Sequence, residues 1–271
     1  MKHNYHTHTF RCHHADPDER AYIEAGLANG LTTLGFSDHA PYCFPGGYNS
    51  GFRVELDMTT DYFMTLGTLR EEYRTTHPEL TILLGFEMEY YPDLFRPTLD
   101  FIDRSAAVLP SGEKAGLEYL ILGQHMTKNE YDGGVPSGKA DDDESRLHAY
   151  VDQVIAGMET GCYSYVAHPD MVNFTGKESI FEKAAAELCA AAKELNVPLE
   201  INLLGLHEHR HYPNDLFWNI AAETGVSAVL GCDAHAAERV GNPVLVAEGE
   251  AFAKAHGLTL LDEVTIRNPL G

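Results

Sequence analysis

The sequence predicts an α/β fold, specifically a distorted TIM-like barrel of the (β/α)7 type. Strand-like apolar runs alternate with helix-like segments along the chain, and this alternation favours a parallel sheet. Some of the runs, such as Tyr119–Leu122, are apolar on both faces, as expected for strands that helices cover on both sides. Most runs are followed directly by His, Asp or Glu, and barrels carry their site residues at that end of each strand.

We expect seven strands, each predicted from a short apolar run. The first opens the chain, the second and seventh follow helices that end near glycine, and the sixth is entered through Pro198. The predicted strands cover residues 2–6, 31–37, 80–86, 118–123, 163–167, 198–203 and 226–232.

Helices are expected between these strands. Asp16 and Pro17 supply an N-cap and a first-turn proline for the first helix. The predicted helices cover residues 16–30, 58–76, 94–105, a segment that ends near 161, 179–195, 213–225 and 243–256. A Gly/Pro/aromatic loop is expected over residues 40–55 and a polar loop over residues 127–142. Within them, residues 41–53 and 128–142 are long enough to close over a bound molecule. No linker divides the chain, so we expect one barrel domain over residues 1–271.

Composition narrows the range of partners. The chain has 41 acidic and 19 basic residues, a net charge of −22, which argues against a nucleic-acid partner or an anionic membrane surface. An anionic substrate would therefore need cations at its site, and bound metal would supply them. Fifteen histidines are far above ordinary usage, so we expect some of them to have a role beyond packing.

The cysteines and the N-terminal segment indicate in which cellular compartment the protein is expected. The five cysteines are an odd number without the spacing of a disulfide framework, and they are predicted to be reduced thiols. No signal-like segment precedes the first strand, and no apolar run approaches the length of a membrane span. The expected location is the cytoplasm.

Nine polar residues near the strand ends are candidate metal ligands. Residues i and i+2 of a strand point to the same side, so His6 and His8 both face the barrel mouth, and Asp233 and His235 repeat this spacing. Imidazole and carboxylate groups gathered at one rim are what a multinuclear metal centre requires. The candidates are His6, His8, His14, His39, Glu87, His125, His168, Asp233 and His235.

Carboxylates at these strand ends suggest specific roles. The two oxygens of Glu87 could bridge two cations roughly 3.5–4 Å apart. Glu89 is expected behind the ligands, and Asp38 is expected to orient His39 or to carry a proton. We therefore predict a metal-dependent hydrolase in which Asp38, His39, Glu87 and Asp233 are catalytic.

These residues resemble the polymerase and histidinol phosphatase (PHP) family of metallohydrolases, in particular its histidinol-phosphatase branch. The resemblance covers about residues 3–240. The motifs that carry it are His6-Thr-His8, Cys12-His-His14, Phe36-Ser-Asp38-His39-Ala-Pro, Gly85-Phe-Glu87, Gly123-Gln-His125, Ala167-His168-Pro-Asp, Leu199-Glu-Ile-Asn-Leu-Leu-Gly-Leu and Gly231-Cys-Asp233-Ala-His235.

The resemblance implies a distorted (β/α)7 barrel that holds three divalent metal ions, for which zinc, iron and manganese all suit the donors. By analogy, one ion would be held by His6, His8, Glu87 and Asp233. A second would be held by Glu87, His125 and His168, and the third by His14, His39 and His235.

The resemblance also implies an activity, the hydrolysis of L-histidinol phosphate to L-histidinol and phosphate in histidine biosynthesis. A metal-bridging hydroxide would attack phosphorus, and the substrate would be a small-molecule phosphate monoester. One departure concerns His207, which stands where the family leads us to expect an arginine that contacts phosphate. Arg53, His207 and Arg210 are therefore the candidates for substrate binding.

Three other functions stay open on the sequence. The chain could be a PHP-type phosphoesterase that acts on a nucleotide or sugar phosphate. It could be an amidohydrolase-like amidase or deaminase, although that class wants a lysine where His125 stands. It could also be a non-catalytic metal-binding or polymerase-associated module, against which the lack of a basic face argues. The oligomeric state is left open.

Overall fold

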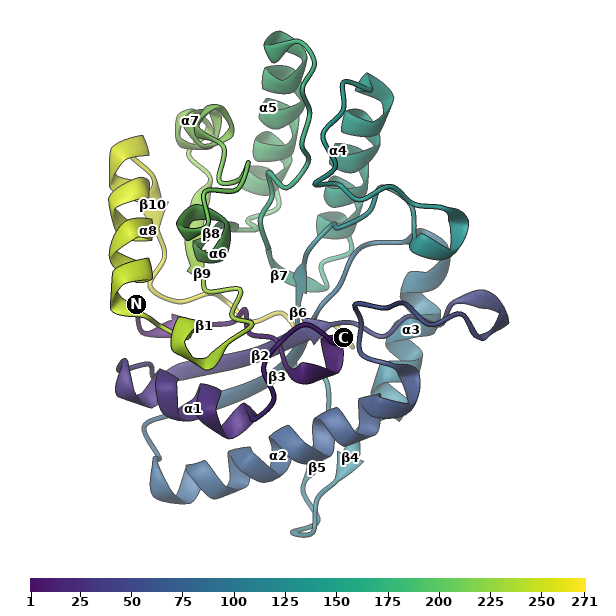
Figure 1. Cartoon of the computed structure of the whole chain (residues 1–271), viewed down its shortest axis with the longest axis vertical. Helices are drawn as coiled ribbons and strands as arrows, with labels where there is room; N and C mark the ends of the chain where they lie inside the picture. The colour runs from purple at the N-terminus through teal and green to yellow at the C-terminus, as the bar shows by residue number, and fades with distance from the viewer.

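The computed structural model describes residues 1–271, and its centre is a parallel sheet of eight strands in the order β1-β2-β3-β6-β7-β8-β9-β10. The strands lie at the centre of the molecule and helices surround them (Figure 1). The predicted fold class, an α/β fold of the distorted TIM-like type, is confirmed. The strands are β1 His3–Asn4, β2 Thr33–His39, β3 Thr81–Glu87, β6 Tyr119–Leu122, β7 Tyr163–Val166, β8 Leu199–Asn202, β9 Ser227–Gly231 and β10 Thr259–Leu260.

Helices connect consecutive strands and cover the outside of the sheet. The first begins later than predicted, because Asp18 and not Asp16 is its N-cap, and Asp18 Oδ1 accepts from the backbone of Arg20 at 3.1 Å. The helices are α1 Glu19–Ala28, α2 Thr59–Thr76, α3 Pro92–Arg104, α4 Glu144–Glu159, α5 Glu178–Glu194, α6 Leu203–His207, α7 Asp215–Thr224 and α8 Pro243–His256.

Several short elements were not predicted from the sequence, among them a hairpin, a short helix and the last strand. An antiparallel hairpin, β4 Ala107–Val108 with β5 Lys114–Ala115, projects from the end of α3. Helix α6 begins at Leu203, where a strand was predicted to continue, because the side chain of Asn202 accepts from Gly205 N at 2.8 Å and caps a helix there. Strand β10 is too short to show an alternating pattern.

The eighth strand arises from the way in which the barrel closes. Near its start, β9 pairs with β10 through Ser227 and Ala228. Beyond its end, Ala234 forms a parallel bridge with Thr7, and Cys232 N donates to Asn4 Oδ1 at 3.0 Å. The first part of this edge of β9 therefore pairs with β10, and the segment beyond the end of β9 pairs with the segment that follows β1. The seven predicted strands therefore surround the rim where the candidate ligands lie. The eighth strand, β10, pairs with β9 at the opposite end of the barrel.

Aromatic side chains fill the interior below that rim. Tyr119 is fully buried and its hydroxyl donates to the carbonyl of Tyr5 at 2.8 Å. Tyr5 also packs edge-on against Tyr119 and Tyr165. Gly35 and Gly85 lie against the Tyr119 ring, where a Cβ at either position would overlap it. These two glycines allow a large aromatic side chain to form the floor of the site.

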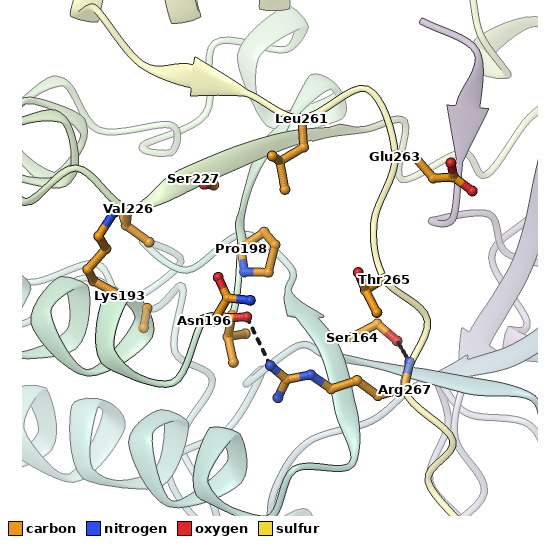
Figure 2. A pocket seen from close by; sticks show the side chains of 12 residues that line it. Ser164, Lys193, Asn196, Pro198, Val226, Ser227, Leu261, Glu263, Thr265 and Arg267 are labelled. Carbon is orange, nitrogen blue, oxygen red and sulfur yellow. Dashed lines mark hydrogen bonds between the residues drawn. The ribbon is translucent and has the colours of Figure 1, made fainter.

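A hollow of about 320 Å³ lies at the N-terminal ends of β8 and β9. The C-terminal segment crosses it, with Arg267 donating to the carbonyls of Leu195 and Asn196 and its backbone N–H donating to Ser164 Oγ (Figure 2). None of the predicted site residues lines this hollow. The candidate site is therefore at the other end of the strands.

The Tyr119 packing can be tested by substitution at the glycines. Gly85→Ala would place a Cβ 2.6 Å from the Tyr119 carbonyl oxygen as well as into its ring. We expect the free energy of unfolding, measured by urea titration, to fall by about 1–3 kcal/mol. Gly51→Ala is the control, since a Cβ there meets no atom within 4 Å. Equal stability of the two variants would contradict the packing described.

Candidate metal centre

The nine predicted ligands come from separate strand ends and converge at one rim. His39 and Glu87 are the last residues of β2 and β3, and the sheet register places them side by side. His125 and His168 follow β6 and β7, and Asp233 follows β9. Because all these strands are parallel, their C-terminal ends meet at the same edge. The remaining members of the set are His6, His8, His14 and His235, in the segments that follow β1 and β9.

Glu87 lies at the centre of the cluster. Its Oε2 is 3.1 Å from His39 Nδ1 and 3.5 Å from His6 Nε2. Its Oε1 is 2.8 Å from His168 Nε2 and 3.3 Å from His125 Nε2. The carboxylate is buried, and a Cβ at Gly123 would overlap Oε1. Oε2 also lies 3.7 Å from His8 Nε2, so each oxygen faces a different set of imidazoles.

Asp233 is a second shared carboxylate. Its Oδ1 lies 3.0 Å from His8 Nε2, 3.4 Å from His6 Nε2 and 3.5 Å from His235 Nδ1. Asp233 has a φ of 46° and His168 a φ of 29°, both in the left-handed region that L-residues adopt at a cost. Such strained positions cluster at functional sites.

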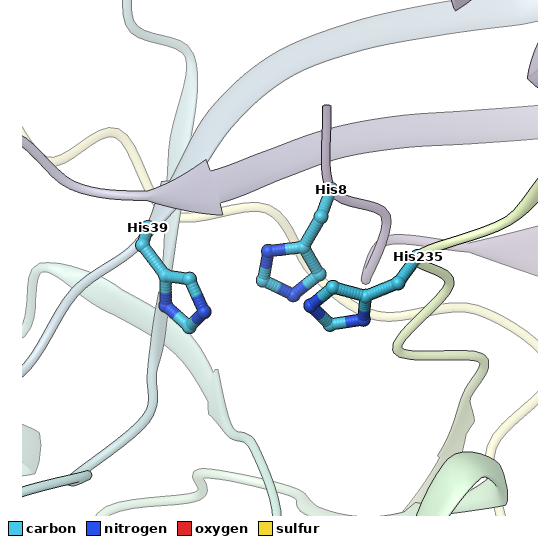
Figure 3. A group of neighbouring side chains, drawn as sticks. All are labelled: His8, His39 and His235. Carbon is cyan, nitrogen blue, oxygen red and sulfur yellow. The ribbon is translucent and has the colours of Figure 1, made fainter. Parts of the chain in front are cut away.

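Histidines from three elements face one another beside these carboxylates. Figure 3 shows the imidazoles of His8, His39 and His235 turned toward a common point. The ring of His8 lies 4.0 Å from that of His235 and 4.5 Å from that of His39, measured between centroids. His14 completes this side, with Nε2 3.0 Å from Nε2 of His235.

The ligand atoms satisfy a direct test of fit to bound cations. Buried polar atoms without a hydrogen-bond partner cost about 1–3 kcal/mol each, so native proteins contain few of them. Here His6 Nε2, both ring nitrogens of His8, His39 Nδ1 and both oxygens of Glu87 are buried and have no partner. His6 Nε2, His8 Nε2 and His39 Nδ1 all lie within 4 Å of Glu87 Oε2, and neutral imidazole nitrogens and carboxylate oxygens are donors that suit divalent transition metals. The residues therefore fit a multinuclear metal site.

Burial and neighbouring charges shift the pKa values of the histidines in different directions. Burial, followed by the charge of His8, lowers the pKa of His235 to about 3 and holds that of His39 well below its usual value. Both imidazoles are thus neutral at neutral pH, which is the form that binds metal. Burial also disfavours the charged form of His6, but the carboxylates of Glu200, Asp233 and Glu87 outweigh it and raise the pKa of His6 well above its usual value.

A second layer of polar groups holds the imidazoles from behind. His6 Nδ1 lies 2.9 Å from Glu200 Oε2, and Asn202 Nδ2 donates to Glu200 and to Asp233 at 2.8 and 3.1 Å. Gly231 leaves space for the Glu200 carboxylate. We did not assign a role to Glu200 or Asn202 from the sequence. The sequence nevertheless contains an indication that these two residues face the site. They are polar residues at i and i+2 in an apolar strand, and they repeat the spacing of His6 and His8.

The structure places the Asp38 carboxylate beside His8 and Thr9, and not against the ring of His39. The Asp38 carboxylate is fully buried and accepts from Thr9 N at 3.1 Å and Thr9 Oγ1 at 2.5 Å, while its Oδ1 lies 3.5 Å from His8 Nδ1. Its only bond to His39 is from the backbone N–H. The side chain therefore supports His8 and the segment that follows it.

Arg53 and His207, two of the three candidates for substrate binding, form ion pairs with carboxylates of the protein. The Arg53 guanidinium is buried and bonded to Glu89 and Glu130, which leaves little capacity for a phosphate. His207 is exposed and turns to Glu248 of α8, 3.1 Å away. Arg210, the third candidate, donates to the hydroxyl of Tyr212, whose ring is 5.9 Å from that of His168.

Comparisons with known proteins agree with the fold and show the family. Residues 4–203 match the PHP domain family. The chain is 25% identical over 241 residues to the "Probable histidinol-phosphatase" of Deinococcus radiodurans, which covers 87% of each chain. The chain therefore belongs to the PHP domain family and is a metal-dependent phosphoesterase of that family.

Two solved structures share the fold. Histidinol phosphate phosphatase of Lactococcus lactis, crystallised with zinc, L-histidinol and phosphate, has a TM-score of 0.70 and 19% identity, covering 99% of this chain and 97% of that one. The putative histidinol phosphatase of Listeria monocytogenes has a TM-score of 0.69 and 18% identity, covering 90% and 99%.

Two further expectations concern the rest of the chain. All five cysteines are free thiols. No helix combines the length and the apolar character that crossing a membrane would require.

Removal of metal should destabilise the folded chain. A ligand that binds only the native state at 1,000 times its dissociation constant adds about 4 kcal/mol, or roughly 10 °C in the midpoint of thermal unfolding. We expect a chelator to lower the midpoint and added zinc or manganese to restore it. His168→Ala should reduce the metal content, whereas His148→Ala, on the exposed face of α4, should not. A midpoint insensitive to chelator would contradict the metal centre.

Proposed function

We propose that this chain is a histidinol-phosphatase, which hydrolyses L-histidinol phosphate to L-histidinol and phosphate. The observation that carries the proposal is the convergence of unpartnered imidazole and carboxylate atoms on both sides of Glu87. The name of the Deinococcus radiodurans relative, which aligns over 87% of this chain, supports the substrate. The Lactococcus lactis protein of similar fold holds zinc, L-histidinol and phosphate.

We propose three groups of ligands for three divalent ions. His6, His8, Glu87 and Asp233 would hold one, and Glu87, His125 and His168 a second. His14, His39 and His235 would hold the third. Ions held in this way would lower the pKa of bound water toward neutrality and would neutralise the charge of a phosphate ester.

The role of the chain is to hold these groups in place and to bind the ester. Phe52 lies with its ring 5.3 Å from His39 and 6.2 Å from His125, in edge contact with both, so it can pack against the organic part of a substrate. Arg210 can supply fixed positive charge to the phosphate. Its present partner Glu208 is exposed, and such surface pairs contribute little, so the guanidinium can turn to a ligand.

A substrate panel tests the activity. Phosphate release would be measured with L-histidinol phosphate, a nucleoside monophosphate and a sugar phosphate, using the metal-depleted and the reconstituted enzyme. We expect kcat/KM to be highest for L-histidinol phosphate, with activity lost on depletion and regained with metal. A higher value for another ester would contradict the substrate and retain the phosphoesterase class.

Substitutions at Arg210 and His207 test the phosphate contact. Arg210→Met should lower kcat/KM for L-histidinol phosphate about tenfold or more, since a hydrogen bond to a charged group contributes about 1.5–3 kcal/mol. His207→Gln is the control, because its side chain faces α8, and it should change kcat/KM less than twofold. The opposite ranking would show that His207 binds the phosphate.

A further inference from the structure

We propose that Arg53 is a positioning residue that connects the loop after β6 to the metal ligand His125. The connection runs from Glu130 in that loop, through Arg53 and Glu89, to the ring of His125. The inference rests on the proposed function, because it takes His125 as a metal ligand. It adds a role for Arg53, Glu89 and Glu130, which are not metal ligands.

Arg53 is held on both sides by carboxylates. Its Nη1 and Nη2 donate to the two oxygens of Glu89, each at 2.7 Å, in a bidentate pair. Its Nε donates to Glu130 Oε1 at 2.5 Å, and Nη2 also reaches Glu130 Oε2 at 3.4 Å. The guanidinium lies over the rings of Phe52 and Tyr42, at 4.4 and 4.9 Å from their centroids. Such a buried fork fits two carboxylates at once, which lysine cannot do.

Glu89 transmits this arrangement to the site. Its Oε1 accepts from Arg53 Nη2 at 2.7 Å and lies 2.9 Å from His125 Nδ1. The same oxygen therefore serves the arginine and the imidazole. A carboxylate behind a ligating histidine sets the tautomer and the orientation of its ring. The other ring nitrogen of His125 points to Glu87 Oε1 at 3.3 Å. Loss of Arg53 would let the Glu89 carboxylate rotate and release His125.

Glu130 transmits the arrangement to the loop. It begins a single turn of 3-10 helix, Glu130–Asp132, whose N-cap is Asn129. The next residue, Tyr131, packs edge-on against Tyr48 of the loop after β2, with 5.9 Å between ring centroids. The Glu130 side chain is only 7% exposed although it belongs to a surface loop. The ion pair with Arg53 thus joins the two loops that flank the mouth of the site.

The carboxylates of Glu89 and Glu130 differ in how easily water could replace Arg53 as their partner. Glu89 follows β3 directly and is fully buried, so it has no route to water. Glu130 lies in a loop and can be hydrated if that loop moves away. An unpaired buried charge is costly, so Arg53 remains on Glu89 and favours the docked position of the loop. The loop is thereby held against the same arginine that fixes His125.

Separate substitutions distinguish the two halves of the connection. Arg53→Met and Arg53→Lys should weaken binding of one metal equivalent by about 10- to 100-fold, the usual effect of losing a group behind a ligand. The visible spectrum of the Co²⁺-loaded protein should change in both variants. Glu130→Gln should keep the metal content and the spectrum, and raise KM for L-histidinol phosphate several-fold with kcat within twofold. Arg53→Met in a His125→Ala background should weaken metal binding no further.

Arg70→Met is the matched control. Arg70 also pairs with two carboxylates, Glu113 and Glu118, and is largely buried, but it lies at the opposite end of β6. Metal affinity in Arg53→Met and Arg53→Lys equal to that of Arg70→Met would overturn the inference, as would additive effects with His125→Ala. Wild-type protein that binds no Co²⁺ would instead contradict the metal centre itself. Metal-binding wild-type protein that leaves L-histidinol phosphate intact would contradict only the proposed substrate.

Discussion

A carboxylate buried among imidazoles is the constraint around which this molecule is organised. Glu87 ends a fully paired central strand, and its register partner is His39. Its two oxygens face opposite sides of the rim, with His39 and His6 on one and His125 and His168 on the other. Burial alone would raise the pKa of Glu87, but the surrounding imidazoles hold it well below the usual range. The carboxylate is therefore charged at the point where cations would be shared.

The packing of the barrel serves this arrangement. Tyr119 closes the interior beneath the rim and needs glycine at positions 35 and 85. Above it, Gly123 and Gly231 leave room for the carboxylates of Glu87 and Glu200. The bridge between Thr7 and Ala234 closes the ring of strands beside His6, His8 and Asp233. Small residues are thus placed where a strand must approach a large or charged side chain.

A further layer of carboxylates surrounds the imidazoles. Asp38 lies behind His8, Glu89 behind His125 and Glu200 behind His6. This layer gives the ligands fixed orientations, and it adds negative charge to a chain whose net charge is already −22. Cations at the centre would offset that charge, and an anionic ester could then approach. Arg53 has a related role, since it balances Glu89 and Glu130 within the protein and does not face the substrate.

The convergence of the nine candidate ligands could be predicted from the sequence because each lies at or beyond the C-terminal end of a strand, and strand period and strand direction are local properties. His6 with His8, and Asp233 with His235, show this most clearly. The partner of a long side chain is not a local property. The sequence makes Arg53 and His207 candidates for substrate binding, but in the fold each pairs with a carboxylate distant in sequence, Glu89 or Glu248. Likewise the role of Glu200, the orientation of Asp38 and the pairing of β10 depend on which strands become neighbours when the barrel closes, and this is a consequence of long-range packing.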